Sequence, residues 1–88
     1  MRVEFLDKFG RDIDKLSVKS VKESVRRLIL QVETAESVTS IPQVKKLAGF
    51  KSAYRIRIGD YRIGIFVEGD LVQFARLVHR KDIYKVFP

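Results

Sequence analysis

The chain has 88 residues, 45% hydrophobic and 33% charged, with no cysteine and a net charge of +7. This composition is typical of one soluble globular domain covering residues 1–88, and it excludes a disulfide framework, a thiol nucleophile and a cysteine metal site. No stretch approaches the roughly 20 apolar residues of a membrane span, and the N-terminus has no long apolar signal segment. We therefore expect a cytoplasmic protein with no membrane partner.

The positive charge is concentrated in the C-terminal half. Residues 1–40 carry eight Lys and Arg against seven Asp and Glu (+1), whereas residues 41–88 carry ten against four (+6). Such an excess favours a polyanionic partner, either nucleic acid or an acidic protein segment. A solvated basic surface would give the same balance, so charge alone does not decide between them.

A short strand and two helices are predicted in the N-terminal half. Met1–Leu6 alternates weakly between apolar and polar residues and is predicted as a strand. Asp7–Leu16 has apolar residues at spacings of four and three, which predicts a short helix with Asp7 as its N-cap. Ser17–Ser37 has apolar residues at helical spacing throughout and is predicted as a second helix. A short link between the two helices predicts an antiparallel helical hairpin.

The start of the second helix has two candidates, and its end is followed by a connector. Either Ser17 caps the helix, or Ser20 does so with Glu23 in a capping box. Val38–Ser52 contains Thr, Ser, Pro and Gly and is predicted as a connector without regular structure. Three apolar side chains of the connector are expected to pack inward: Val44, Leu47 and Phe50.

Ala53–Val67 (AYRIRIGDYRIGIFV) predicts a β-hairpin with a two-residue Gly59-Asp60 turn. Side chains alternate between the two faces of a strand. One face of the hairpin is therefore apolar, and the other carries three arginines: Arg55, Arg57 and Arg62. The turn places Arg57 opposite Arg62, although like charges directly across a ladder are destabilising. We therefore expect an anion to bind on this face.

A third strand, Leu71–Val78, is predicted after a turn at residues 68–70. Alternation from that turn assigns Val72, Phe74 and Val78 to the apolar face, with Arg76 near an edge. The same alternation assigns Gln73, Ala75, Leu77 and His79 to the arginine face. The chain is then expected to end in a short helix or coil. The order β-α-α-β-β-β predicts an α+β fold, with the helical hairpin packed on one face of a small antiparallel β-sheet.

The arginine face is the predicted site. Arginine binds phosphate in a bidentate manner and stabilises developing negative charge, but it cannot act as a base. His79 is the only histidine, the residue type best suited to proton transfer near neutral pH. Tyr84 offers a hydroxyl that can donate a proton and a ring on which a base can stack. The predicted catalytic residues are Arg55, Arg57, Arg62, His79 and Tyr84, and the predicted RNA- or phosphate-binding residues are Lys51, Arg80 and Lys81.

These residue types suit attack of an RNA 2′-OH on its own 3′-phosphate without a metal ion. Each residue also has a simpler interpretation: His79 as a packing residue, Tyr84 as part of a terminal apolar patch, and the arginines as a solvated face. No carboxylate pair, Gly-rich phosphate loop, Ser/His/Asp set or metal cluster is recognisable. We therefore expect no metal and no small-molecule cofactor.

Two motifs, YRIRIGDYR and HRKDIY, follow a helical hairpin in a chain of under 100 residues. In this layout the chain resembles the RelE/ParE superfamily of toxins from prokaryotic toxin–antitoxin modules, and more narrowly the RelE-type mRNA endoribonucleases. The resemblance covers nearly the whole chain. It implies a compact α+β fold, metal-independent cleavage of mRNA in the ribosomal A site, and inhibition by a cognate antitoxin wrapped around the toxin.

The resemblance places the family's basic strand positions on Arg55, Arg57 and Arg62. It places the later basic and histidine positions on His79 and Arg80, and the C-terminal tyrosine on Tyr84. Some RelE toxins have lysines where Arg55 and Arg57 stand, so any proton abstraction here would fall to His79 or Tyr84. Two alternatives remain: a ParE-like inhibitor of DNA gyrase that shares the scaffold without a nuclease site, and a non-toxic relative that retains antitoxin binding.

Overall fold

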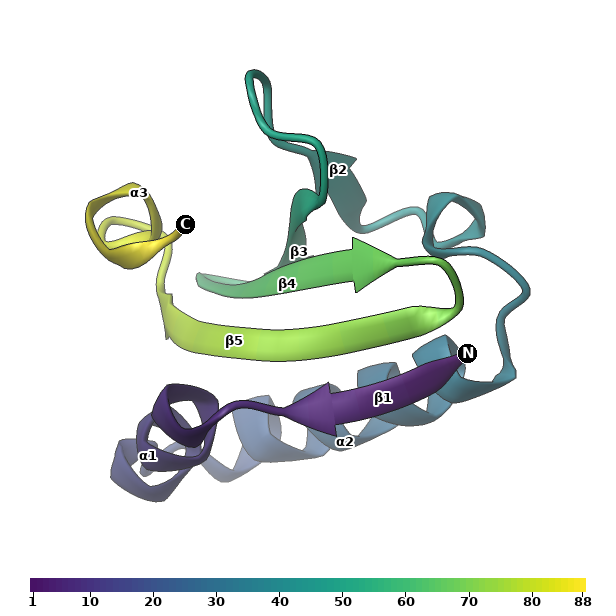
Figure 1. Ribbon diagram of the computed structural model, residues 1–88. Helices are drawn as coiled ribbons and strands as arrows, with labels where there is room; N and C mark the ends of the chain where they lie inside the picture. The colour runs from purple at the N-terminus through teal and green to yellow at the C-terminus, as the bar shows by residue number, and fades with distance from the viewer.

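The computed structural model describes all 88 residues. Two helices follow the first strand, three further strands run in succession near the end of the chain, and a short strand and a 3₁₀ turn lie between these groups (Figure 1). In chain order the elements are β1 (Arg2–Phe5), α1 (Asp7–Lys15), α2 (Lys19–Thr34), the 3₁₀ turn (Val38–Ser40), β2 (Val44–Lys46), β3 (Ala53–Ile58), β4 (Tyr61–Glu68), β5 (Leu71–His79) and α3 (Ile83–Val86). None of the helices is long and apolar enough to cross a membrane.

The five strands form one sheet in the order β1-β5-β4-β3-β2. The α+β class is confirmed, but the prediction of a purely antiparallel sheet is wrong, because β1 pairs with β5 in parallel. Arg2 donates to the carbonyl of Asp70 (2.8 Å) and Leu6 to that of Phe74 (2.9 Å), so these bonds hold the first strand against the last one. The sheet is therefore mixed.

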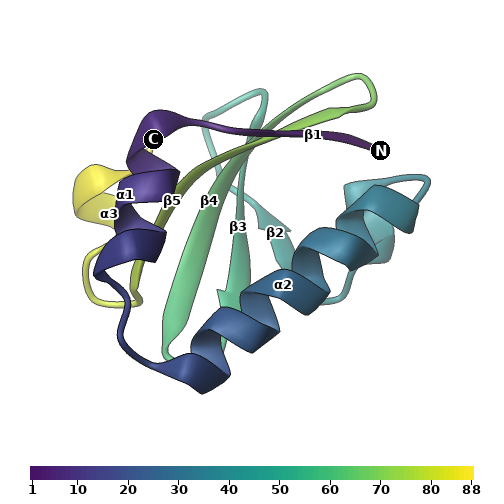
Figure 2. The ribbon, with the colours of Figure 1, turned by 90° about the horizontal axis from the view of Figure 1, so that it is seen from below.

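Both long helices lie on one face of the sheet (Figure 2). They diverge from their short link: α1 lies against β5, and α2 crosses β1 and β3. The expected antiparallel hairpin is therefore an open pair in which each helix packs on the sheet rather than mainly on the other helix. Beneath them lies the main core, a cluster of thirteen buried residues: Phe9, Leu16, Val25, Leu28, Val32, Val38, Ile41, Ile56, Ile63, Ile65, Val72, Phe74 and Leu77.

The predicted helix caps are wrong. The N-cap positions are Leu6 for α1 and Val18 for α2, and neither has a side-chain capping hydrogen bond. Asp7 instead occupies the first turn of α1, where a carboxylate favours the helix dipole. Ser37 lies beyond the end of α2, and its side chain accepts a hydrogen bond from Thr39 N (3.3 Å) to cap the 3₁₀ turn.

The predicted connector contains a strand that the sequence did not indicate. β2 pairs antiparallel with β3, with Lys45 opposite Arg55, and forms one edge of the sheet. Leu47 is buried as expected, and Val44 is partly buried. The expectation for Phe50 is wrong, because this side chain is 50% exposed on the loop between β2 and β3.

A β-bulge changes which side chains of β5 face the helices. The register is Ile65 opposite Phe74 before the bulge and Gly64 opposite Arg76 after it, so Ala75 is the extra residue. One extra residue shifts the alternation and moves every following side chain to the other face. The predicted faces of the last residues are therefore wrong: Leu77 belongs to the main core, and Val78 packs on the other side of the sheet.

Arg76 is not simply exposed at an edge. Its Nε donates to Asp12 Oδ2 (2.8 Å) and its Nη2 to Asp12 Oδ1 (3.2 Å). The same carboxylate accepts a hydrogen bond from Leu77 N (2.9 Å). β1 pairs with β5 only as far as Phe74. Beyond that point Asp12 of α1 takes the place of a strand, because it accepts the hydrogen bond of the Leu77 backbone N–H.

Candidate functional site

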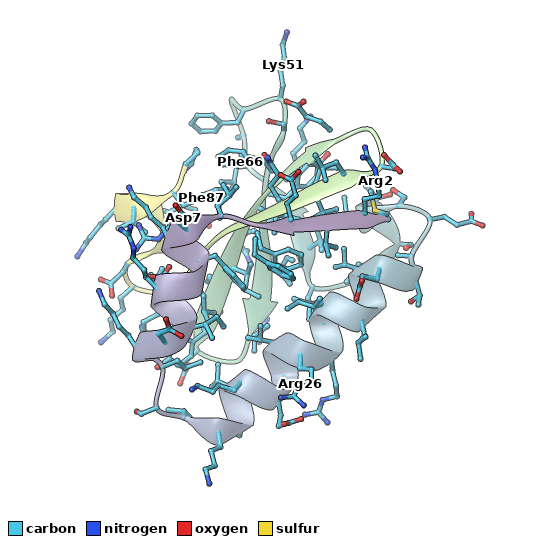
Figure 3. The ribbon with its side chains drawn as sticks, turned by 60° about the horizontal axis from the view of Figure 1, so that its bottom comes forward. Arg2, Asp7, Arg26, Lys51, Phe66 and Phe87 are labelled. Carbon is cyan, nitrogen blue, oxygen red and sulfur yellow. The ribbon has the colours of Figure 1, made fainter.

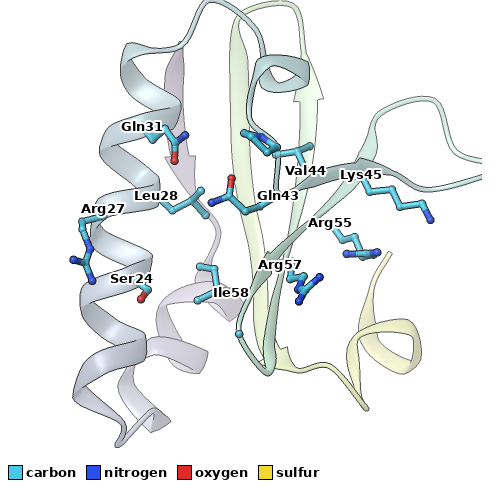
Figure 4. Close-up of a pocket in the computed structure, with 12 residues that line it drawn as sticks. Ser24, Arg27, Leu28, Gln31, Gln43, Val44, Lys45, Arg55, Arg57 and Ile58 are labelled. Carbon is cyan, nitrogen blue, oxygen red and sulfur yellow. The ribbon is translucent and has the colours of Figure 1, made fainter.

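Arg55, Arg57 and Arg62 share the sheet face opposite the two long helices. Arg57 pairs with Arg62 across β3 and β4, and Arg55 pairs with Gly64 two positions away. Figure 4 shows Arg55 and Arg57 on the same side of β3. The predicted hairpin geometry is confirmed, including the direct opposition of two cations.

The backbone of the hairpin holds Arg62 in place. Its Nη1 donates to the carbonyl oxygens of Gly59 (2.8 Å) and Tyr61 (2.9 Å). These bonds fix the guanidinium group against the β3–β4 turn, while Nε and Nη2 make no hydrogen bond within the protein. Arg62 is therefore a fixed cation whose Nε and Nη2 groups are free to donate hydrogen bonds to a ligand.

Arg62 is surrounded by charges of its own sign. Partial burial is the main cause of a lowered pKa at this guanidinium, followed by repulsion from Arg55, Arg57 and Arg80. Tyr84 acts in the opposite direction and raises the pKa of Arg62. An arginine stays protonated at physiological pH, so this environment stores repulsion that a bound anion would relieve.

We define the arginine cluster as Arg55, Arg57, Arg62 and Arg80 together with Tyr84. Arg80 reaches the cluster because its N–H donates to the carbonyl of Asp60 (2.8 Å), which holds the exit of β5 against the β3–β4 turn. The carboxylate of Asp60 lies 3.8 Å from Arg80 Nε in an exposed ion pair. Exposed pairs of this kind are weak and screened by salt, so the cluster keeps most of its positive field.

His79 does not join the arginine cluster. It pairs with Tyr61, whereas Arg62 pairs with Val78, so alternation places His79 on the face that the helices cover. Its ring contacts the edge of the Tyr61 ring (centroids 5.7 Å apart), and its Nδ1 accepts a hydrogen bond from Lys81 N (3.2 Å). The expected place of His79 on the arginine face is wrong, because the Ala75 bulge could not be seen in the alternation.

The three basic residues predicted to bind RNA or phosphate outside the strands lie in different places. Arg80 lies in the cluster, and Lys81 is exposed in the turn after β5. Lys51 extends from the tip of the β2–β3 loop, away from the body of the domain (Figure 3). Lys51 precedes β3, whereas Arg62 follows the turn at the other end of that strand.

Lys45 is a basic residue of this face that the sequence did not reveal. It pairs with Arg55 and extends beside it from β2 (Figure 4). An open groove of about 880 Å³ lies at this edge of the sheet, lined in part by Arg55, Arg57 and Lys45, and by Arg27 of α2. The cation surface therefore continues from the hairpin turn to the edge strand.

The family of the chain follows from a comparison with known proteins. A family model described as the ParE toxin of the type II toxin–antitoxin system parDE matches residues 3–84. The chain belongs to the RelE/ParE superfamily of toxins from type II toxin–antitoxin systems.

Within this superfamily the chain is similar to RelE toxins of archaea. It is 36% identical over 89 residues to Toxin RelE3 of Methanocaldococcus jannaschii, and the match covers all of both chains. A chain in the RelB-RelE antitoxin-toxin complex from Methanococcus jannaschii has a TM-score of 0.81 at 34% identity, covering 96% of this chain and 98% of that one. A chain in the RelE-RelB complex from Pyrococcus horikoshii has a TM-score of 0.75 at 24% identity, covering 93% and 97%, and shows the same fold.

Proposed function

We propose that this toxin is an endoribonuclease that cleaves mRNA during translation, in the ribosomal A site. The observation that supports this proposal is the arginine cluster: three arginines share the sheet face that the long helices leave free, and Arg80 and Tyr84 of the C-terminal segment are near enough to influence the pKa of Arg62. The 36% identity to a protein named as a RelE toxin supports it further.

The reaction we propose is attack of the RNA 2′-OH on the adjacent phosphorus. The O2′–P bond forms and the P–O5′ bond breaks, which gives a 2′,3′-cyclic phosphate and a free 5′-OH. One proton leaves the 2′-OH and one proton is delivered to the departing 5′-oxygen. Arg55, Arg57 and Arg62 would bind the phosphate and stabilise the additional negative charge of the pentavalent transition state.

Tyr84 is the proposed proton-transfer residue. It is near enough to Arg62 to influence the pKa of that guanidinium, and it is 66% exposed, so an RNA strand can reach it. The arginines cannot exchange the proton, and His79 lies on the other face of the sheet. Arg80, Lys81 and Lys45 would contact neighbouring phosphates, which adds affinity but little sequence preference.

A cognate antitoxin is the proposed protein partner. Two of the structural relatives are chains of complexes named as RelB with RelE. The positive field of the arginine cluster favours an acidic or amphipathic antitoxin segment, and such a segment could become ordered on binding. By covering the cluster it would block access of RNA to Tyr84.

The test uses expression of single variants, with growth arrest and cleavage of a reporter mRNA as the two measurements. We expect Arg62→Ala and Tyr84→Phe to abolish both effects, and His79→Ala to retain them. Arg26→Ala is the matched control, because Arg26 is an exposed arginine on α2, away from the cluster (Figure 3). Cleavage that continues when translation is blocked would contradict the ribosome-dependent part, and full toxicity of Arg62→Ala and Tyr84→Phe would contradict the site.

A ParE-like inhibitor of DNA gyrase is the second candidate, because the matching family model is that of a ParE toxin. In this case the same cations would contact gyrase or its DNA without chemistry. Purified protein would then inhibit DNA supercoiling and leave mRNA intact, and Tyr84→Phe would remain toxic.

A further inference from the structure

The segment that carries Tyr84 is anchored by the residues on either side of it. Ile83 and Phe87 are 1% and 3% exposed, whereas Tyr84 is 66% exposed. Phe87 N donates to the carbonyl of Ile83 (2.8 Å), which closes the turn of α3 between the two anchors. The position of Tyr84 therefore depends on Ile83 and Phe87 rather than on contacts of its own.

These anchors belong to a second, smaller core on the face opposite the long helices. It contains five buried residues: Leu47, Ala53, Ala75, Ile83 and Phe87. The ring of Phe87 also packs against Phe66 of β4, with centroids 5.0 Å apart. Two of the five residues are alanines from the sheet, so the sheet offers a hollow in which larger side chains of the C-terminal segment fit.

Gly64 forms the floor of this hollow. A Cβ atom at position 64 would lie 2.5 Å from Phe87 Cγ, and 2.6 and 2.7 Å from the two Cδ atoms. Gly64 does not have a positive φ, so its backbone is open to any residue. The requirement for glycine at position 64 therefore comes from the aromatic ring that lies on the strand.

We propose that Phe87 is the positioning residue for Tyr84, and that its ring is held by packing over Gly64 of β4. The proposal rests on the ribonuclease function proposed above. Phe87 is buried and does not face RNA; it acts by holding α3 on the sheet so that Tyr84 stays on the face that carries the arginines. Gly64 pairs with Arg55 and lies two residues from Arg62 on β4, so the ring lies next to the arginines that Tyr84 must meet.

The proposal predicts that the anchor can be released without unfolding the domain. The main core of thirteen residues includes neither Gly64 nor any residue after Leu77. The Phe87 ring packs on Phe66 and over Gly64, and none of these three residues belongs to the main core, so the ring can leave the sheet without opening that core. A side chain at position 64 should therefore displace α3 and leave the sheet and the long helices intact.

The experiment compares Gly64→Ala and Phe87→Ala with two further variants. Phe87→Leu keeps an apolar anchor, and Gly10→Ala is the matched glycine control, because a Cβ there meets nothing within 4 Å. Three properties are measured: amide hydrogen exchange of Lys85 and Phe87, the NMR signal of Arg62 Nε, and cleavage of reporter mRNA. Thermal unfolding of each variant reports on the main core.

We expect Gly64→Ala and Phe87→Ala to speed exchange at both amides, shift the Arg62 signal and retain a cooperative unfolding transition. Cleavage should fall about 10²-fold, the effect of a small misplacement of a reacting group. Phe87→Leu should restore part of the amide protection and part of the cleavage, and Gly10→Ala should leave amide exchange and cleavage unchanged. The double variant, Gly64→Ala with Phe87→Ala, should cleave mRNA as fast as Phe87→Ala alone, because both changes disrupt the same contact between the ring and β4.

Three results would overturn the proposal. Protected amides in both variants would mean that Phe87 is not the anchor, and full cleavage with released amides would mean that Tyr84 needs no positioning. Loss of the whole fold in both variants would mean that the small core cannot open independently of the main core. Exchange and the Arg62 signal need no RNA, so a wild-type chain that cleaves no mRNA would refute the proposed function while the anchor is still tested.

Discussion

The two faces of the sheet are built from different residues. The face under α1 and α2 buries thirteen side chains, among them two phenylalanines, four isoleucines and three leucines. The other face buries five residues, two of them alanines, and leaves the rest of its area to the arginine cluster. The difference teaches that burial on one face stabilises the fold strongly enough for the other face to keep opposed, unpaired cations.

Phe74→Ala is expected to have the largest effect on stability. Phe74 is fully buried, and its ring lies 5.5 Å from that of Phe5 and 5.4 Å from that of Phe9. Removal of a buried phenylalanine ring lowers the free energy of unfolding by about 3–5 kcal/mol. This loss is a large fraction of the total stability of a small domain. Urea denaturation measures it.

Phe50→Ala is the control for this change, because Phe50 is half exposed on the β2–β3 loop. We expect the free energy of unfolding to change by no more than about 0.5 kcal/mol. Equal losses for the two phenylalanines would contradict the view that stability is concentrated under the helices.

Asp12→Asn is expected to have an intermediate effect. The Asp12 carboxylate accepts hydrogen bonds from Arg76 and from Leu77 N, and it raises the pKa of the Arg76 guanidinium. The two side chains are only 20% (Arg76) and 9% (Asp12) exposed. Loss of the charged acceptor should lower the free energy of unfolding by about 1–3 kcal/mol.

Asp14→Asn is the matched control on the same helix, since Asp14 is exposed and makes no hydrogen bond or ion pair. Its effect should be close to zero. If the two variants had equal stability in urea, the attachment of α1 to β5 would depend on apolar contacts alone.

The sequence predicted the β3–β4 hairpin because two local rules fix it together. Alternation assigns the faces, and the two-residue turn sets the register that places Arg57 opposite Arg62. The last strand could not be predicted in the same way. The Ala75 bulge reverses the alternation halfway along β5, and the parallel pairing of β1 joins residues near the two ends of the chain.

The same physical limits decide which site residues could be predicted. Arg55, Arg57 and Arg62 lie on strands with regular alternation, so their shared face followed from their spacing. His79 follows the bulge and was assigned to the wrong face. Lys45 was missed because a strand of three residues has no measurable alternation, and Lys51 was included only for its nearness in sequence.

Arg57→Gln is expected to have the smallest effect on stability and, unlike the others, a favourable one. Arg57 is exposed and lies directly opposite Arg62, and the removal of like charges from a cross-strand pair should raise the free energy of unfolding by about 0.2–1 kcal/mol. The gain should shrink in 1 M salt, because screening there reduces the repulsion in the wild type. If the cluster exists to bind phosphate, the same variant should lose mRNA cleavage although it folds more stably. A variant that is less stable than wild type at low salt would mean that Arg57 is held by attractive contacts, and the contrast between a stabilising face and a functional face would then not hold at this residue.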